Sequence, residues 1–202
     1  MNFAQAVSLV ASILCTIAPG LQVLHILRTR SVAGLSVLTC VALVMGNCLA
    51  ILIGVQYSLG LTLAIMILSL IIQSVMLHLV SPRAALATGA AVIAAIAGTT
   101  LLAPGLAADI LTTRYHEQVA FLWGIIAATT FIPQVLVTRR TRQTKDLSWL
   151  TVITFAVGFT LWTTFAVMVR NWSLMLWCGI LTLSVYELVR LKLAEKGARA
   201  VM

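Results

Sequence analysis

Two side chains suited to binding a ligand lie well inside long apolar stretches of the chain. Asn47 stands in the middle of the run 36–57, and Trp162 stands well inside the run 148–169. An amide within a membrane helix is expected to face the protein interior, where it bonds either a neighbouring helix or a ligand. An indole deeper than the interfacial belt offers a flat surface on which a ligand can stack. These residue types predict recognition of a small molecule rather than the making or breaking of bonds.

Other polar residues inside apolar runs carry weaker signals. Gln73 lies in the run 60–80, and two serines, Ser69 and Ser74, lie close to it. Hydroxyl groups in helices often bond the backbone of their own helix, so these serines are weaker candidates for a ligand site.

The remaining reactive residues form no catalytic or metal-binding pattern. All four cysteines fall inside apolar runs without a C-x-x-C spacing, and the three histidines lie at run ends or in a loop. Metal sites need closely spaced donors, and the motifs of hydrolases and metalloproteases do not occur here. We therefore expect neither an enzyme, nor a metal site, nor a cofactor.

The composition is that of a membrane protein. Of 202 residues, 61% are hydrophobic and 9% are charged, with a mean hydropathy of +1.10. Soluble domains contain about 25% charged residues, so this chain cannot cover a water-soluble surface. The net charge of +8 does not indicate a nucleic-acid partner, because the cations stand between apolar runs, where they report membrane topology.

Seven apolar runs have about the length that a helix needs to cross a bilayer. They cover residues 3–27, 36–57, 60–80, 85–107, 119–138, 148–169 and 172–192. Eleven Lys and Arg residues follow the odd-numbered runs, and only Arg114 and Arg170 lie on the opposite side. The positive-inside rule predicts an outside N-terminus and a cytoplasmic C-terminus. Short loops and minimal tails favour a bacterial inner membrane.

The chain contains an internal repeat. Residues 22–36 align without a gap on residues 134–148, an offset of 112 positions, and eight of the fifteen residues are identical. The first three runs then match the last three, which predicts parallel repeats about an axis along the membrane normal. We divide the chain into a first repeat (1–80), a linker helix with its outer loop (81–115) and a second repeat with the tail (116–202). The linker is rich in Ala and Gly, so it is expected to pack closely on its neighbours.

Each repeat carries a proline within its first apolar run. Pro19 and Pro133 each remove a helical hydrogen bond, which predicts a bend or a hinge. A glutamine follows each proline, Gln22 in the first repeat and Gln134 in the second. We expect these glutamines to cap freed carbonyls or to contact a neighbouring helix.

The second repeat resembles a known family. Phe131–Ser148, with its F-x-P-Q, short basic stretch and L-S, resembles the PQ-loop motif, and the 3+1+3 arrangement resembles the SWEET and SemiSWEET transporters over nearly the whole chain. In the first repeat Leu21-Gln22 replaces Pro-Gln, and the proline is displaced to Pro19. The resemblance implies alternating access about a central pocket, with the prolines as hinges.

The resemblance also implies where the pocket lies. Trp162 occupies the family's aromatic position in the second helix of a repeat, and Ala50 is its partner in the first repeat. Met66 and Cys178 occupy the positions where relatives carry asparagine. A thioether and a thiol are weaker partners for sugar hydroxyls than an amide is.

The expected function is transport of mono- or disaccharides by a facilitator. No carboxylate lies in mid-membrane, where proton relays are found, which favours transport without proton coupling. The resemblance leaves one exception, since some PQ-loop relatives couple to protons through an acidic residue near the motif. Asp146 therefore stays a candidate for proton coupling. Two alternatives remain, a PQ-loop transporter of amino acids or another small polar metabolite, and a non-transporting receptor or scaffold. The expected partners are a small solute and membrane lipid. The sequence leaves open whether copies of the chain associate. One chain already holds both halves, so a monomer should suffice.

Overall fold

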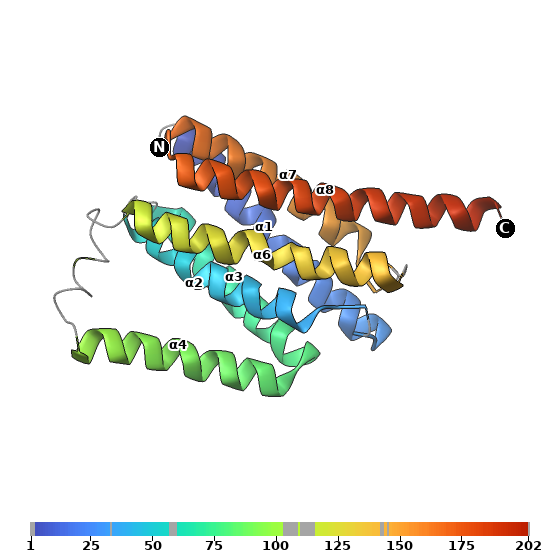
Figure 1. Ribbon diagram of the computed structural model, residues 1–202, viewed down its shortest axis with the longest axis horizontal. Helices are drawn as coiled ribbons and strands as arrows, with labels where there is room; N and C mark the ends of the chain where they lie inside the picture. The colour runs from blue at the N-terminus through green and yellow to red at the C-terminus, as the bar shows by residue number, and fades with distance from the viewer. Residues whose placement is uncertain are drawn as a thin grey trace.

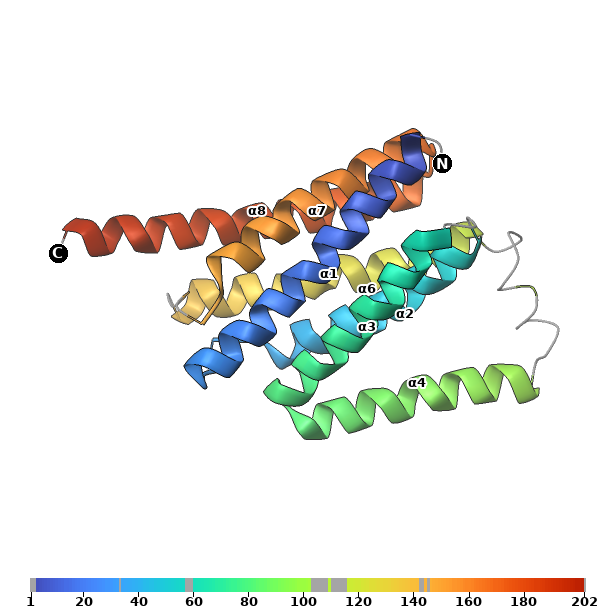
Figure 2. The same cartoon turned by 180° about the vertical axis from the view of Figure 1, so that it is seen from behind.

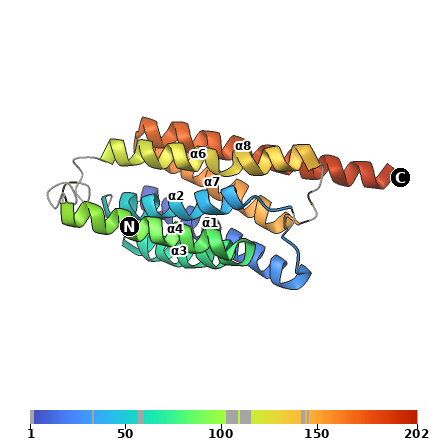
Figure 3. The ribbon, with the colours of Figure 1, turned by 60° about the horizontal axis from the view of Figure 1, so that its bottom comes forward.

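The computed structural model describes residues 3–32, 34–56, 60–102, 109, 116–141, 144 and 146–201. Within these ranges the chain forms seven long helices: α1 (Phe3–Thr29), α2 (Val37–Gln56), α3 (Gly60–Val80), α4 (Pro82–Leu102), α6 (His116–Thr141), α7 (Trp149–Met168) and α8 (Trp172–Val201). Each predicted run corresponds to one helix. The largest difference is at α8, which continues past the last apolar run because the tail consists mainly of good helix formers. Figures 1 and 3 show its last turns extending beyond the bundle.

Five of these helices are long and apolar enough to cross a membrane. They are α1, residues Val37–Val55 of α2, α3, α7 and residues Trp172–Glu195 of α8, whereas the apolar part of α4, Pro82–Gly98, is shorter. Large apolar side chains such as Leu61, Ile71 and Leu183 point out of the bundle. An all-helical protein with this exterior has the build of an integral membrane protein.

The helices form two groups of three with matching contacts. In one group α1 and α2 both pack against α3, and in the other α6 and α7 both pack against α8. Between the groups, α1 packs against α7 and α2 packs against α6 (Figures 1 and 2). The 112-residue offset pairs α1 with α6, α2 with α7 and α3 with α8. Under this pairing each helix contact has a counterpart: α1–α3 matches α6–α8, α2–α3 matches α7–α8, and α1–α7 matches α2–α6. The two groups are therefore related by an approximate twofold axis.

Helix α4 lies at the side of the bundle, against α3 and α2 (Figures 1 and 2). Most of its surface is exposed, including Ile93 and Ile96. A Cβ atom added at Gly89 or at Gly98 would meet no atom within 4 Å. The expected close packing through small residues is thus wrong for these two glycines, because among the described residues nothing lies within contact distance of their added Cβ atoms.

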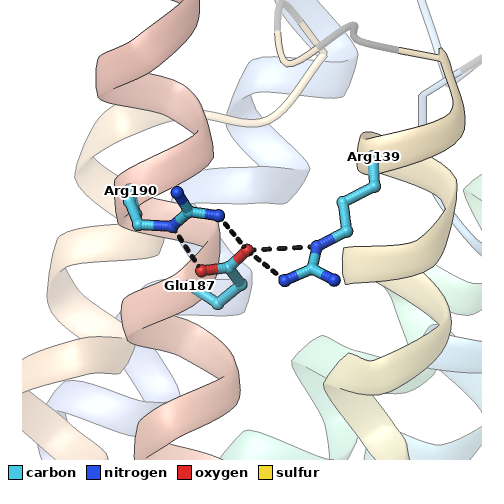
Figure 4. A network of polar contacts seen from close by, with 3 residues as sticks. All are labelled: Arg139, Glu187 and Arg190. Atoms are coloured by element: carbon cyan, nitrogen blue, oxygen red, sulfur yellow. Dashed lines mark hydrogen bonds and ion pairs between the residues drawn. The ribbon is translucent and has the colours of Figure 1, made fainter.

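The described basic residues gather at one end of the bundle. The ends of α1 and α6 and the beginning of α4 lie there, whereas Arg170 lies in the α7–α8 turn at the other end (Figure 1). Figure 4 shows Glu187 between Arg139 of α6 and Arg190 of its own helix, with nitrogen–oxygen distances of 2.6 Å to both. Arg114, Arg142 and Lys145, and the side chains of Lys196 and Arg199, lie outside the described residues.

The two equivalent crossings between the groups differ in tightness. A Cβ added at Gly158 in α7 would lie 2.7 Å from the sulfur of Cys15 in α1. At the equivalent Gly46 in α2, the nearest atom would be a methyl group of Ile126 at 3.8 Å. At under 3 Å a neighbouring group has to move, here the Cys15 side chain or the helix that carries it, whereas 3.8 Å is an ordinary van der Waals distance.

We therefore expect Gly158→Ala to destabilise the protein by about 1–3 kcal/mol, the usual cost of overpacking, and Gly46→Ala to have little effect. Thermal unfolding of both variants in the same detergent measures the difference. Equal melting temperatures for the two variants would contradict the tight α1–α7 crossing.

Candidate functional site

A central cavity of about 80 Å³ lies between the two groups of helices. Its lining comes from α1, α2 and α3 on one side and from α6, α7 and α8 on the other. Room of this size accommodates several water molecules. The cavity therefore lies at the interface that the approximate twofold axis creates.

Four of the five residues expected at the pocket line this cavity: Asn47, Ala50, Met66 and Trp162. Cys178 does not line it, because its short side chain is fully enclosed in the packed core. The amide nitrogen of Asn47 also donates to the backbone carbonyl of Met66 at 2.7 Å. Asn47 thus ties α2 to α3, one of its two expected roles, and it also lines the cavity.

The two walls of the cavity differ in chemistry. The first group contributes most of the polar side chains, among apolar neighbours such as Leu43 and Ile53, and the second group adds Thr130. The polar residues of the first group are Ser12, Thr16, Asn47, Ser69 and Gln73. Gln73 donates to the Ser69 hydroxyl at 3.1 Å, which leaves its own side-chain oxygen, and the Ser12 hydroxyl, without a hydrogen-bond partner among the described residues. Buried polar atoms are normally satisfied, so these two have hydrogen-bonding capacity left for water or a ligand. The weak sequence signal at Gln73 and Ser69 underestimated this wall.

The second group contributes an aromatic wall. The rings of Phe155 and Phe159 stack at 5.5 Å, and Phe131 meets both edge-on at 5.1 and 5.6 Å. Trp162 follows Phe159 on the same side of α7 and is 8% exposed. Sequence reasoning identified Trp162 alone. The spacing 155, 159 and 162 places all three rings on one helix face, a signal that was available.

The prolines occupy different environments in the two groups. Pro19 is fully buried, and Pro133 is partly exposed. Both helices continue without interruption through their prolines. The residue equivalent to Pro19 is Phe131, which packs edge-on against Phe155 and Phe159 and reflects the shifted proline of the first repeat.

The two glutamines make reciprocal hydrogen bonds across the axis. The Gln22 amide nitrogen donates to the Asp146 carbonyl at 2.8 Å, and its oxygen accepts from the Ser148 backbone nitrogen at 3.1 Å. The Gln134 nitrogen donates to the Gly34 carbonyl at 2.9 Å, and its oxygen accepts from the Ser36 nitrogen at 3.0 Å. Each glutamine thus bonds the opposite group's loop rather than capping its own helix. We call these four bonds the glutamine clamps.

Gly34 and Asp146 meet between the clamps. A Cβ at Gly34 would lie 2.8 Å from one carboxylate oxygen of Asp146, although the two residues are equivalents under the 112-residue offset. Equivalent residues in contact must lie at the twofold axis. The Ser31 hydroxyl donates to the other carboxylate oxygen at 2.8 Å, and Asp146 is buried. It lies at the basic end and does not line the central cavity.

Helix α8 holds the same loop from the side. The ammonium group of Lys192 donates to the carbonyls of Thr144 and Leu147 at 2.8 and 2.6 Å and lies 5.7 Å from the Trp149 ring centre. Glu195 accepts from the Thr144 backbone nitrogen at 2.9 Å. The bundle is thus closed at its basic end by side chains that bond loop backbone.

Comparisons of the chain with family models, with curated proteins and with solved structures give no match.

Proposed function

We propose that this protein is a membrane transporter that moves small uncharged polar solutes, sugars foremost, by alternating access between its two groups of helices. The observation that carries the proposal is the central cavity between the two groups, which Asn47 and Trp162 both line. The glutamine clamps join the two groups nearer the basic end. Solute sites between parallel repeats are a recurring transporter design. A non-transporting scaffold would need neither an interior cavity with unpartnered polar atoms nor a closure made of hydrogen bonds.

The membrane arrangement follows from the repeat and the charges. In this proposal the groups are parallel three-helix repeats of the PQ-loop type, related to the SWEET family, and α4 is the linker between them. The basic end faces the cytoplasm of a bacterial inner membrane, and the N-terminus lies outside. The clamps then form the cytoplasmic gate, and the described conformation is closed on that side.

The lining of the cavity favours uncharged solutes. Among its described residues there is no carboxylate, ammonium or guanidinium group that would neutralise a charged substrate. Several polar side chains from one group and aromatic rings from the other suit a sugar ring, which presents hydroxyl groups at its edge and C–H groups on its face. Asp146 stands apart from the cavity, which supports a facilitator rather than proton coupling. The prolines are the proposed hinges of the rocking motion.

Uptake of labelled glucose, sucrose and neutral and cationic amino acids into proteoliposomes tests the proposal. We expect saturable sugar uptake that a pH gradient does not change. Trp162→Ala should raise the KM by about two- to tenfold, because aromatic stacking contributes about 0.5–1.5 kcal/mol. Asn47→Ala should also lower uptake. Trp172→Ala is the matched control. Trp172 is also a tryptophan, but it is 76% exposed at the start of α8 and does not line the cavity.

Two results would overturn parts of the proposal. Uptake of an amino acid that requires an acidic outside would replace the sugar claim and assign proton coupling to Asp146. Absence of uptake for every solute, from protein with a cooperative unfolding transition, would favour a receptor or scaffold.

A further inference from the structure

An ion-pair network lies on the outer surface of the α6–α8 pair. The carboxylate of Glu187 accepts two N–H groups from the guanidinium of Arg139 and two from that of Arg190, at 2.6–3.1 Å (Figure 4). Both arginines are also open to the surroundings, since their side chains are 55% and 68% exposed. We call Arg139 and Arg190, with Glu187 between them, the arginine pair.

The charges of the arginine pair do not balance. Two guanidinium groups share one carboxylate, so the network carries a net positive charge. Among the described residues, no second carboxylate pairs with either guanidinium, and the N–H groups that do not bond Glu187 have no partner. Arg139 alone would neutralise Glu187 and join α6 to α8. Arg190 therefore supplies charge and donors beyond what the helix contact needs.

The surroundings of the arginine pair suit the boundary between acyl chains and headgroups. Arg139 lies in the last turn of α6, at the basic end of the bundle. One turn earlier each helix presents an exposed leucine, Leu136 in α6 at 58% and Leu183 in α8 at 72%. Uncompensated positive charge beside hydrocarbon is costly. The phosphate of an anionic lipid would neutralise that charge and accept from the remaining N–H groups, since arginine suits bidentate binding of phosphate.

The first group of helices has no such network at the equivalent place. Under the 112-residue offset, the counterparts of Arg139, Glu187 and Arg190 are, in that order, Leu27, Val75 and His78. Leu27 and Val75 are 52% and 47% exposed, so the α1–α3 pair presents apolar side chains there. Apolar residues thus satisfy this outer position in one group. The charges in the other group indicate a role beyond the packing of two helices.

We propose that the arginine pair binds the headgroup phosphate of an anionic phospholipid in the leaflet at the basic end, with the acyl chains along Leu136 and Leu183. Glu187 is the positioning residue, because it fixes both guanidinium groups and leaves their other N–H groups for the phosphate. Basic pockets between membrane helices on the cytoplasmic side bind anionic headgroups in this way. The inference needs a membrane around the bundle, but it does not need transport.

Native mass spectrometry of the full chain, purified in detergent, measures lipid binding directly. Dioleoylphosphatidylglycerol is titrated, with zwitterionic dioleoylphosphatidylcholine for comparison, and the dissociation constant of the first bound lipid is determined. The test variant combines Arg139→Gln with Arg190→Gln. The matched control combines Arg28→Gln with Arg83→Gln, which removes the same charge from exposed residues at the same end of the bundle.

The parent should bind phosphatidylglycerol in preference to phosphatidylcholine. The test variant should weaken phosphatidylglycerol binding about 30-fold, which converts to about 2 kcal/mol for two arginines. The control variant should leave it unchanged. Arg139→Lys combined with Arg190→Lys keeps the charge but removes the planar guanidinium groups, so it should lose most of the preference.

A single variant separates lipid binding from a purely structural role. Arg190→Gln keeps the ion pair between α6 and α8, yet it should weaken phosphatidylglycerol binding about fivefold. Its melting temperature in lipid-free micelles should stay close to that of the parent, because exposed ion pairs contribute little to stability.

Several results would overturn the inference. Equal binding of both lipids by the parent, or equal losses in the test and control variants, would leave only a general attraction of the basic end. Phosphatidylglycerol binding that survives the test variant would reduce the ion pairs to a link between helices. Competition by free glycerol 3-phosphate at the concentration of the lipid would make this a site for a soluble phosphate compound. None of these results depends on solute uptake, so the proposed function stands or fails separately.

Discussion

Replacement of Gln22 and Gln134 together by leucine is expected to shift the protein out of its closed conformation. Each glutamine makes two hydrogen bonds to the opposite loop, and each bond contributes about 1 kcal/mol. Loss of one clamp should therefore lower the ratio of closed to open protein about 30-fold, and loss of both about 1,000-fold. A transporter held open on one side cannot complete its cycle, so uptake should be lost in the double variant.

The methanethiosulfonate reaction of Cys40 measures this shift directly, because the thiol lies between the clamps and the central cavity. Its rate should rise in each single variant and rise further in the double variant. Gln22→Leu and Gln134→Leu serve as controls for each other, since both remove the same pair of bonds and should have similar effects. An unchanged Cys40 rate in the double variant would show that the clamps do not form the gate.

Gly34→Asp should be among the most harmful single substitutions in the chain. It would put a second buried carboxylate against Asp146, where even a Cβ atom approaches to 2.8 Å. Overpacking and like-charge repulsion together should cost on the order of 3 kcal/mol. Asp146→Gly alone should be milder, because it removes mainly the bond from Ser31.

The combination of Gly34→Asp with Asp146→Gly makes the prediction specific. It restores one carboxylate and one glycine at the axis with their sides exchanged, so it should recover most of the stability and uptake that Gly34→Asp loses. Thermal unfolding of the parent, both single variants and the double variant gives the coupling energy. Additive effects would mean that the two residues do not meet at the axis.

Much of the fold could be predicted from the sequence because the repeat is preserved in one gapless stretch. The apolar runs locate seven helices, and most helix ends lie within about three residues of the run ends. The offset of 112 residues also pairs Gln22 with Gln134 and Ser36 with Ser148, which are the residues that the clamps join. Periodicity and repeat register are properties of the chain itself, so sequence alone can reveal them.

The missed features depend on contacts between distant segments. Apolar composition does not indicate that Phe155 and Phe159 face a cavity rather than lipid, since phenylalanine suits both environments. The sequence could propose a glutamine contact with a helix, but the actual partner is a loop from the other half, more than a hundred positions away.

The contact of Gly34 with Asp146 shows what a single chain permits that two identical half-chains do not. In a symmetric dimer of three-helix subunits, any residue on the axis faces its own copy, so a lone acidic side chain could not be placed there without its double. Joined by α4, the two halves can differ at that point and across the cavity, with one wall polar and the other aromatic. The covalent connection through α4 therefore allows the two halves to carry different residues at equivalent positions.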